Sequence, residues 1–258
     1  IKYKDIYSAV EIKNNLEDSI SYAEIINILT NIYGYKLSDR RKYTLNDFYF
    51  SDIKNQKQAY ILGLLAADGY VGYHNEFVIS SKDFDILEKI RIEMDISKEL
   101  ATGSKGGYEN SGRNKEIRIS SKFLVNDLNK LGYFPNKSLT FNKIPDIKDD
   151  LKRHFLRGYF DGDGSITHYV RDYKVKNKIY SYDRLTMTIL ATEPLLYQFI
   201  DFFEIEKYSI TRSKTEGLKY LYISAKKEIF HMYNLMYTDS EISLNRKREI
   251  WDKYIMSL

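Results

Sequence analysis

The stretch FLRGYFDGDGSI, residues 155–166, joins an apolar helical pattern to two aspartates among glycines. If residues 153–163 form a helix, Gly164 is the natural residue beyond its C-terminus, where a left-handed conformation is expected. Asp163 then lies at the negative end of the helix dipole, where an acid costs about 0.3–1 kcal/mol. Asp-Gly pairs are also common in solvated turns, so this stretch alone leaves a turn and a functional site equally open.

A second stretch, AYILGLLAADGYV at residues 59–71, repeats the pattern. Aligned on their glycines, the two stretches share small residues four apart and a final acid: Gly63 with Gly158, Ala67 with Gly162, and Asp68 with Asp163. Small residues at this spacing form a flat strip that lets two helix backbones approach closely. The repeat therefore predicts two helices packed together, with both aspartates at the same end.

Two carboxylates at the negative ends of two helix dipoles repel each other. A divalent cation is the simplest compensation, since hard cations prefer carboxylate oxygens and water. Asp161 has no counterpart in the first stretch, where Ala66 takes its place. The expected metal ligands are therefore Asp68, Asp163, Ala67 and Gly162, with Mg²⁺ as the ion and Mn²⁺ as a substitute.

Both stretches resemble the nine-residue motif of the LAGLIDADG homing endonucleases, as ILGLLAADG at 61–69 and LRGYFDGDG at 156–164. Asp68 and Asp163 fall on the last acid of that motif. Two motifs in one chain are typical of the single-chain, pseudo-symmetric branch of the family. The resemblance implies an α+β fold, in which two αββαββα half-domains pack through their motif helices and curved antiparallel sheets form a DNA-binding saddle.

The sequence around the motifs agrees with this layout. Strand-like alternation followed by helical spacing occurs twice in each half, in residues 76–94, 116–131, 184–203 and 220–236. Residues 132–150 hold two of the three prolines and little periodicity, which is typical of a linker. We therefore predict a first half-domain over residues 51–134, a linker over 135–150 and a second half-domain over 151–258.

Residues 1–50 lie outside the repeat. Helical spacing over residues 6–34 predicts a short N-terminal helical extension. Part of it resembles the first helix of a helix-turn-helix unit, although no clear second helix follows. We interpret the segment as an accessory DNA-contacting region.

Composition excludes several classes of protein. The chain has no cysteine, so disulfides, cysteine-ligated zinc and thiol catalysis are excluded. It has no apolar run near the roughly 18 residues of a membrane span and no charged-then-apolar leader, so we expect it in the cytoplasm or within an organelle. A net charge of +4 is compatible with a nucleic-acid partner without requiring one.

Alternation along the strands predicts which side chains face outward. A sheet with one face on the core presents alternate residues outside, and a two-stranded ribbon fits the major groove of B-DNA. Taken singly, each such residue also suits an ordinary solvated surface. The residues expected to contact DNA are Glu76, Ser80, Lys105, Arg113, Lys115, Arg118, Ser120, Tyr169, Arg171, Tyr173, Lys174, Lys176, Lys178, Tyr182, Arg184, Thr186, Thr188, Arg212, Lys214 and Tyr222.

The resemblance further implies a monomeric, metal-dependent endonuclease of intron homing. Such an enzyme hydrolyses both strands of double-stranded DNA at a long asymmetric site. The family also uses a basic residue near each site, and Lys122 in ISSK and Lys226 in ISAK occupy matching places. Lys137 and Arg246 are the alternatives.

Another function remains open on the same scaffold, namely an intron RNA maturase that binds RNA and aids splicing. The presence of both Asp68 and Asp163 favours active cleavage, because an RNA-binding splicing factor has no need of paired acids at helix ends.

Overall fold

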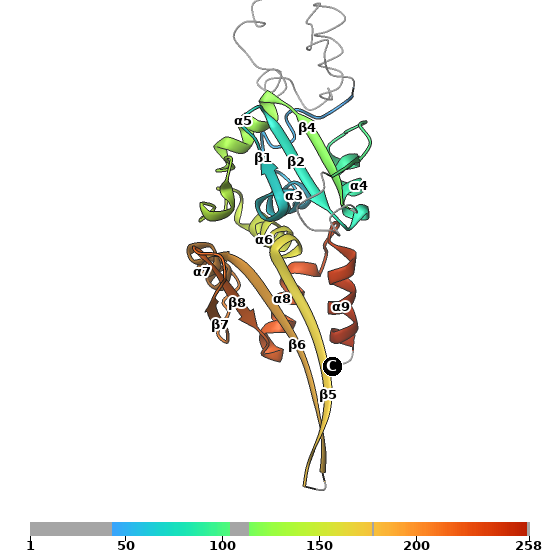
Figure 1. Cartoon of the computed structure of the whole chain (residues 1–258), viewed down its shortest axis with the longest axis vertical. Helices are drawn as coiled ribbons and strands as arrows, with labels where there is room; N and C mark the ends of the chain where they lie inside the picture. Colours follow the sequence, from blue (N-terminus) through green and yellow to red (C-terminus); the bar gives the residue numbers. More distant parts are fainter. Residues whose placement is uncertain (1–42, 104–113, 177, 257–258) are drawn as a thin grey trace, which may run out of the picture.

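The computed structural model describes residues 43–103, 114–176 and 178–256 (Figure 1). The predicted α+β layout is confirmed, because each half contains a four-stranded antiparallel sheet with helices packed against it. The first half consists of α3 (Gln56–Asp68), β1 (Gly69–Val71), β2 (Glu76–Ser81), α4 (Phe84–Glu93), β3 (Ala101–Thr102), β4 (Lys115–Ser120) and α5 (Lys122–Lys130). The second half consists of α6 (Asp149–Asp163), β5 (Gly164–Val175), β6 (Lys178–Thr192), α7 (Glu193–Phe202), β7 (Ser209–Arg212), β8 (Leu218–Ile223), α8 (Lys226–Tyr237) and α9 (Asn245–Met256).

The two sheets have the same strand order, β1-β2-β4-β3 in the first half and β5-β6-β8-β7 in the second. The register agrees as well, since Ile79 pairs with Gly69 and Ile117 as Ile189 pairs with Gly164 and Leu221. The side chains predicted to face inward are buried: Phe77, Ile79, Ile117, Ile119, Leu185, Met187 and Ile189. The halves are therefore two copies of one architecture.

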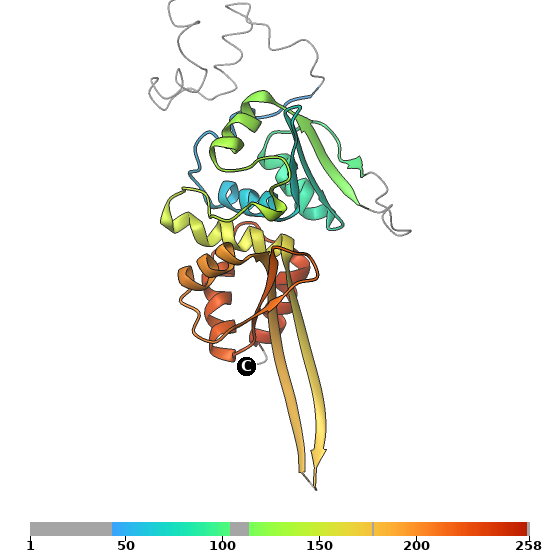
Figure 2. The same cartoon turned by 60° about the vertical axis from the view of Figure 1, so that its left-hand side comes forward.

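The motif helices α3 and α6 pack against each other between the two sheets (Figure 2). A Cβ atom on Gly63 would lie 1.9 Å from the Phe155 carbonyl oxygen, and one on Gly158 would lie 2.0 Å from the Tyr60 carbonyl oxygen. Any side chain at these two positions would overlap the backbone of the facing helix, so the helices can approach this closely only because both residues are glycine. The predicted strip of small residues is therefore confirmed.

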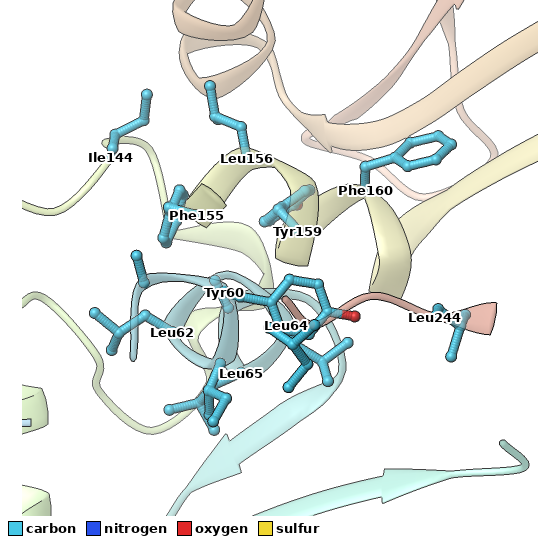
Figure 3. Close-up of a cluster of buried hydrophobic side chains, with 14 of the residues drawn as sticks. Tyr60, Leu62, Leu64, Leu65, Ile144, Phe155, Leu156, Tyr159, Phe160 and Leu244 are labelled. Atoms are coloured by element: carbon cyan, nitrogen blue, oxygen red, sulfur yellow. The ribbon is translucent and has the colours of Figure 1, made fainter. Parts of the chain in front are cut away.

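Apolar side chains from both halves surround this helix pair (Figure 3). Leu62 and Leu65 of α3 and Phe155 and Phe160 of α6 are buried, and Ile144 joins them from the segment between the halves. The two halves therefore share one continuous hydrophobic core.

Gly164 does not adopt the left-handed conformation that we expected, and neither does its counterpart Gly69. Gly69 has φ −91° and Gly164 has φ −87°, both with extended backbone. The reason is that β1 and β5 begin at these residues, so the chain passes directly from helix to strand. Glycine is needed there for space, because a Cβ atom on Gly164 would lie 2.2 Å from Phe160 Cδ2.

A long hairpin extends beyond the second sheet (Figure 1). β5 and β6 pair from Gly164 and Ile189 as far as Val175 and Lys178, whereas β8 pairs with β6 only from Met187 onward. We call residues 167–175 and 178–186 the ribbon. Its base contacts α9, where the rings of His168 and Tyr254 lie 5.1 Å apart.

The segments flanking the motif helices pack closely. Tyr49 and Phe50, which we assigned to the N-terminal extension, are buried in the common core. Phe141 and Ile147 of the predicted linker are buried as well. The extension over residues 1–42 lies outside the described residues. Helix α9 was not distinguished in the sequence.

None of the helices in the described ranges combines the length and apolar character needed to cross a membrane.

Candidate active site

The two motif aspartates meet at one end of the helix pair, as the sequence predicted. Asp68 is the last residue of α3 and Asp163 is the last residue of α6. The position of a Cβ atom on Gly162 lies only 3.3 Å from Asp68 Oδ2, so the Asp68 carboxylate rests against the end of α6. The side chain of Asp68 is exposed and that of Asp163 is half-buried. Both carboxylates are therefore within reach of a ligand.

Both aspartates are held in an environment that disfavours their charge. Burial raises the pKa of Asp163 to about 6, and the negative charge of Asp68 adds to the effect. Burial also raises the pKa of Asp68, because protein atoms surround it on most sides although solvent reaches it. Lys137 and Lys247 oppose these shifts in both cases. Burial, more than the balance of charges, therefore disfavours the ionised carboxylates.

Two buried lysines hold the ends of the motif helices. Lys137, in the short helix η2 (Lys137–Leu139), donates to the Gly69 carbonyl oxygen at 2.6 Å. Lys247 of α9 donates to the carbonyl oxygens of Phe160 and Asp161, both at 2.7 Å. These carbonyls lie at helix ends, where most have no intrahelical partner; the Phe160 carbonyl also accepts from the Gly164 N–H. Burial lowers the pKa of each lysine to about 8, although the nearby aspartates oppose the shift.

The lysines that we matched to the family's basic residue lie elsewhere. Lys122 and Lys226 are the exposed first residues of α5 and α8, and neither is among the charges that shift the pKa of Asp68 or Asp163. The structure brings Lys137, our alternative, and Lys247 to the aspartates instead. Arg246, the other alternative, pairs with Asp83 at 3.3 Å.

Asp161, which the repeat left unmatched, is part of the packing. It is fully buried and accepts hydrogen bonds from the hydroxyls of Tyr60 and Tyr237 at 2.7 and 2.8 Å. The backbone N–H of Leu244 donates to the same carboxylate at 2.8 Å. These bonds tie the segment before α9 to the motif helix, and so place Lys247 beside the end of α6.

The donor groups at the site suit a hard divalent cation. In the part of the chain that the structure describes, neither Asp68 nor Asp163 has a lysine or arginine at ion-pair distance. The Tyr159 hydroxyl hydrogen-bonds to the Asp163 carboxylate, which still leaves lone pairs on that group for a cation. The same described residues contain no cluster of three acidic, histidine or cysteine ligands. The residues present therefore offer two carboxylates and the backbone oxygens of Ala67 and Gly162, and water or phosphate would complete the coordination.

On the first sheet, four of the residues expected to contact DNA share the outward face: Glu76, Ser80, Arg118 and Ser120. Arg118 forms ion pairs with Glu116 at 2.8 Å and with Glu76 at 3.3 Å. Lys115 has the opposite parity and donates to Thr102 Oγ1 at 3.3 Å. Lys105 and Arg113 lie outside the described residues. The charge of the one outward arginine is thus balanced within the protein.

On the second half, the predicted residues with outward parity form one continuous face along sheet and ribbon: Tyr169, Arg171, Tyr173, Lys178, Tyr182, Arg184, Thr186, Thr188 and Tyr222. The other four differ from this set. Lys174 lies on the reverse face of the ribbon, Lys176 lies in its turn with φ 52°, Arg212 has inward parity but is exposed, and Lys214 lies in the loop after β7.

Sequence reasoning missed Tyr180, which lies on the same outward face. Its ring stacks on that of Tyr173, with centroids 5.7 Å apart. The parity that placed Tyr182 and Arg184 outside would have identified it.

Comparisons with known proteins agree with this architecture. A family model described as LAGLIDADG-like domain matches residues 150–200. Among solved structures, the I-LtrWI LAGLIDADG homing endonuclease bound to target DNA is 15% identical with a TM-score of 0.55, and the match covers 82% of this chain and 90% of that one. I-SmaMI bound to an uncleaved DNA target with calcium ions is 12% identical with a TM-score of 0.55, over 80% of this chain and 92% of that one.

A curated relative, the replication factor C small subunit of Methanocaldococcus jannaschii, is 34% identical over an alignment of 137 residues, and the match covers 47% of this chain. The chain spans only 7% of the length of that protein.

Two like four-stranded sheets around a pair of glycine-packed motif helices define an α+β fold in two similar halves. Residues 150–200 match the LAGLIDADG-like domain, and the chain has the single-chain, two-domain fold seen in the structures of LAGLIDADG homing endonucleases, as the resemblance predicted.

The raised pKa of Asp163 predicts that Asp163→Asn stabilises the fold. A carboxyl group whose pKa is higher in the folded chain than its ordinary 3.8 costs stability once it is ionised. That cost develops as the pH rises from about 4 to about 6 and is constant above. We expect Asp163→Asn to raise the free energy of unfolding by on the order of 2 kcal/mol at pH 7.5, with the difference closing below about pH 4.

Denaturant titrations in EDTA at several pH values would measure this difference without a bound cation. Asp201→Asn, at an exposed position of α7, is the control and should show no such difference. A gain that is equal at pH 4 and pH 7.5 would contradict the assignment of the raised pKa to Asp163.

Proposed function

We propose that this protein is a site-specific endonuclease that hydrolyses both strands of double-stranded DNA, using a divalent metal ion held by Asp68 and Asp163. The observation that carries the proposal is the meeting of these two aspartates at the ends of glycine-packed helices, without ion-pair partners among the described residues. A structural role would favour neutral or paired side chains at such a place, because each carboxylate there has a raised pKa.

The two outward sheet faces are arranged in a way that suits the binding of a DNA duplex. Outward polar and basic side chains of both sheets supply surfaces on either side of the aspartates, and two-stranded ribbons fit the major groove. I-LtrWI and I-SmaMI, whose structures are similar to this one, were both solved bound to DNA, which supports double-stranded DNA as the partner. With one aspartate from each half, the two carboxylates would serve the two strands. One chain carries both motif helices, so we propose that a monomer is the active form and that its target is long and asymmetric.

Asp68 and Asp163 would hold the cation, with the carbonyl oxygens of Ala67 and Gly162 beside them. When bound, Mg²⁺ or Mn²⁺ lowers the pKa of a coordinated water and stabilises a leaving oxygen. Lys137 and Lys247 would place positive charge beside the reacting phosphates, where charge increases in the transition state. Their bonds to helix-end carbonyls fix both ammonium groups in position.

The test is cleavage of a randomised duplex library in Mg²⁺ and in Mn²⁺, with sequencing of the ends. Cutting of both strands at one long site is the expected result. Selective binding of DNA or RNA without any cutting in either ion would overturn the proposal. A preference for intron RNA in that case would support the maturase alternative.

Removing either buried lysine should slow cleavage more than removing either exposed one. We expect Lys137→Met and Lys247→Met to lower the cleavage rate by about a hundredfold, since a positioned charge near the reacting phosphate is lost. Lys122→Met and Lys226→Met are the matched controls and should cut within about threefold of the unmodified protein, because neither acts on the aspartates. The measurement is the cleavage rate of each variant on the selected site at saturating protein. Equal losses in all four variants would contradict the assignment of Lys137 and Lys247 to the site.

A further inference from the structure

Arg184 is exposed on the outward face where the ribbon joins the sheet. It pairs with Tyr169 across the strands and is two residues from Thr186 on the same face. Its guanidinium group donates to the Tyr182 hydroxyl at 2.6 Å and to the hydroxyl of Ser224. Both acceptors are neutral, so they orient the group without cancelling its charge.

The surroundings of Arg184 leave its charge available. Among the described residues, no carboxylate lies at ion-pair distance from it. Its sequence neighbour Asp183 has the opposite parity and binds His168 at 2.7 Å. Arg184 also borders an open recess of about 800 Å³, whose lining includes Thr186, Tyr222 and Glu206. The Glu206 carboxylate is paired with Lys227 at 3.2 Å rather than with Arg184.

Arg118, the outward arginine of the first sheet, is in the opposite situation. Its guanidinium group forms two ion pairs, with Glu116 at 2.8 Å and with Glu76 at 3.3 Å, and these neutralise its charge. The outward faces of the halves are thus chemically different although their strand order is the same. The first presents a balanced ion cluster, and the second presents an uncompensated, oriented guanidinium group.

We propose that Arg184 is a specificity-determining residue that reads a guanine in the major groove on the second-half side of the target, while Arg118 does not read a base. This inference rests on the proposed function. A guanidinium group has five N–H donors, and Arg184 uses two of them within the protein. The remaining donors can pair with the O6 and N7 acceptors of guanine, a pattern that no other base pair presents.

The register fixes where this guanine should lie. Tyr169, the cross-strand partner of Arg184, is five residues after Gly164, which directly follows Asp163. A strand rises about 3.3 Å per residue, so Arg184 lies roughly 17 Å along β5 from Gly164, at the end of the motif helix. At 3.4 Å per base pair, the guanine is expected about 5 base pairs from the centre of the cleavage site.

The experiment is selection of bound and of cleaved sites from a randomised duplex library by four proteins: the unmodified chain, Arg184→Ala, Arg184→Lys and Arg118→Ala. The unmodified chain should prefer guanine at one position about 5 base pairs from the centre. Arg184→Ala should lose that preference by about tenfold to a hundredfold at this position only. Arg184→Lys keeps the charge but not the paired donors, so it should keep affinity and lose most of the preference.

Arg118→Ala is the matched control on the other half and should leave the guanine preference unchanged. Thermal unfolding would show that each variant is folded. A consensus that is the same for Arg184→Ala and the unmodified chain would overturn the inference while leaving the endonuclease proposal intact. Absence of cutting would overturn the endonuclease proposal, whereas the bound sites would still decide the role of Arg184.

Discussion

Replacing either motif aspartate with asparagine is expected to lower double-strand cleavage by about a thousandfold or more, which corresponds to about 4 kcal/mol of transition-state stabilisation. Asparagine has nearly the same shape, but it carries no negative charge and so cannot hold a divalent cation as a carboxylate does. Asp68 lies against the end of α6 and Asp163 is the end of α6, so each variant disrupts the same shared site.

DNA binding should survive both substitutions, because the outward faces of the sheets are unchanged. The measurements are strand-specific cleavage of a labelled site in Mg²⁺ and its affinity in Ca²⁺ for Asp68→Asn, Asp163→Asn and the surface control Asp201→Asn. Cleavage by either motif variant at the unmodified rate would remove the aspartates from the mechanism. A loss of binding that matches the loss of cleavage would mean that they act on affinity rather than on chemistry.

Gly63→Ala is expected to destabilise the protein by more than about 3 kcal/mol, or to prevent folding. The added methyl group would lie 1.9 Å from the carbonyl oxygen of Phe155 and 2.8 Å from the nitrogen of Tyr159. Both atoms belong to the backbone of α6, so no side-chain rotation can relieve the clash and the helices must separate. Gly158→Ala meets the backbone of α3 in the same way and should behave alike.

Urea unfolding of both variants would measure this effect. Gly103→Ala is the matched control, because a Cβ atom there has no neighbour closer than 3.5 Å among the residues that the structure describes. It should lie within about 0.5 kcal/mol of the unmodified protein. A Gly63→Ala protein as stable as Gly103→Ala would show that the helix pair does not depend on close backbone contact.

The fold could be predicted from the sequence because its determinants are local and repeated. The glycine spacing and final acid of each motif define a helix, its packing face and its end within nine residues. Alternation then placed residues such as Phe77 and Leu185 inward correctly, since a strand with one buried face shows its parity directly. The packing of the two motif helices against each other could be predicted from the repeat alone, because both stretches carry small residues at the same spacing.

Of the two lysines at the site, the sequence pattern suggested Lys137 only as an alternative and did not suggest Lys247. Lys137 reaches α3 from a short turn that follows Asn136, which has a left-handed backbone with φ 62°. Lys247 reaches α6 because Asp161 fixes the backbone at Leu244, just before α9. Both placements depend on contacts far apart in the sequence. Local matching therefore favoured Lys122 and Lys226, which are equivalent in sequence pattern but are the exposed first residues of their helices.

The contact between the motif helices is reciprocal. Gly63 of α3 meets the backbone at Phe155 and Tyr159, and Gly158 of α6 meets the backbone at Tyr60 and Leu64. Contacts of this kind, in which each partner offers the same feature to the other, characterise the isologous interface of a two-fold symmetric dimer. The protein is thus built like a dimer whose two subunits are covalently joined. Its two halves can differ in sequence except where α3 and α6 meet. Recombining a half with one from a relative therefore requires that the glycine and the facing backbone be kept on both sides.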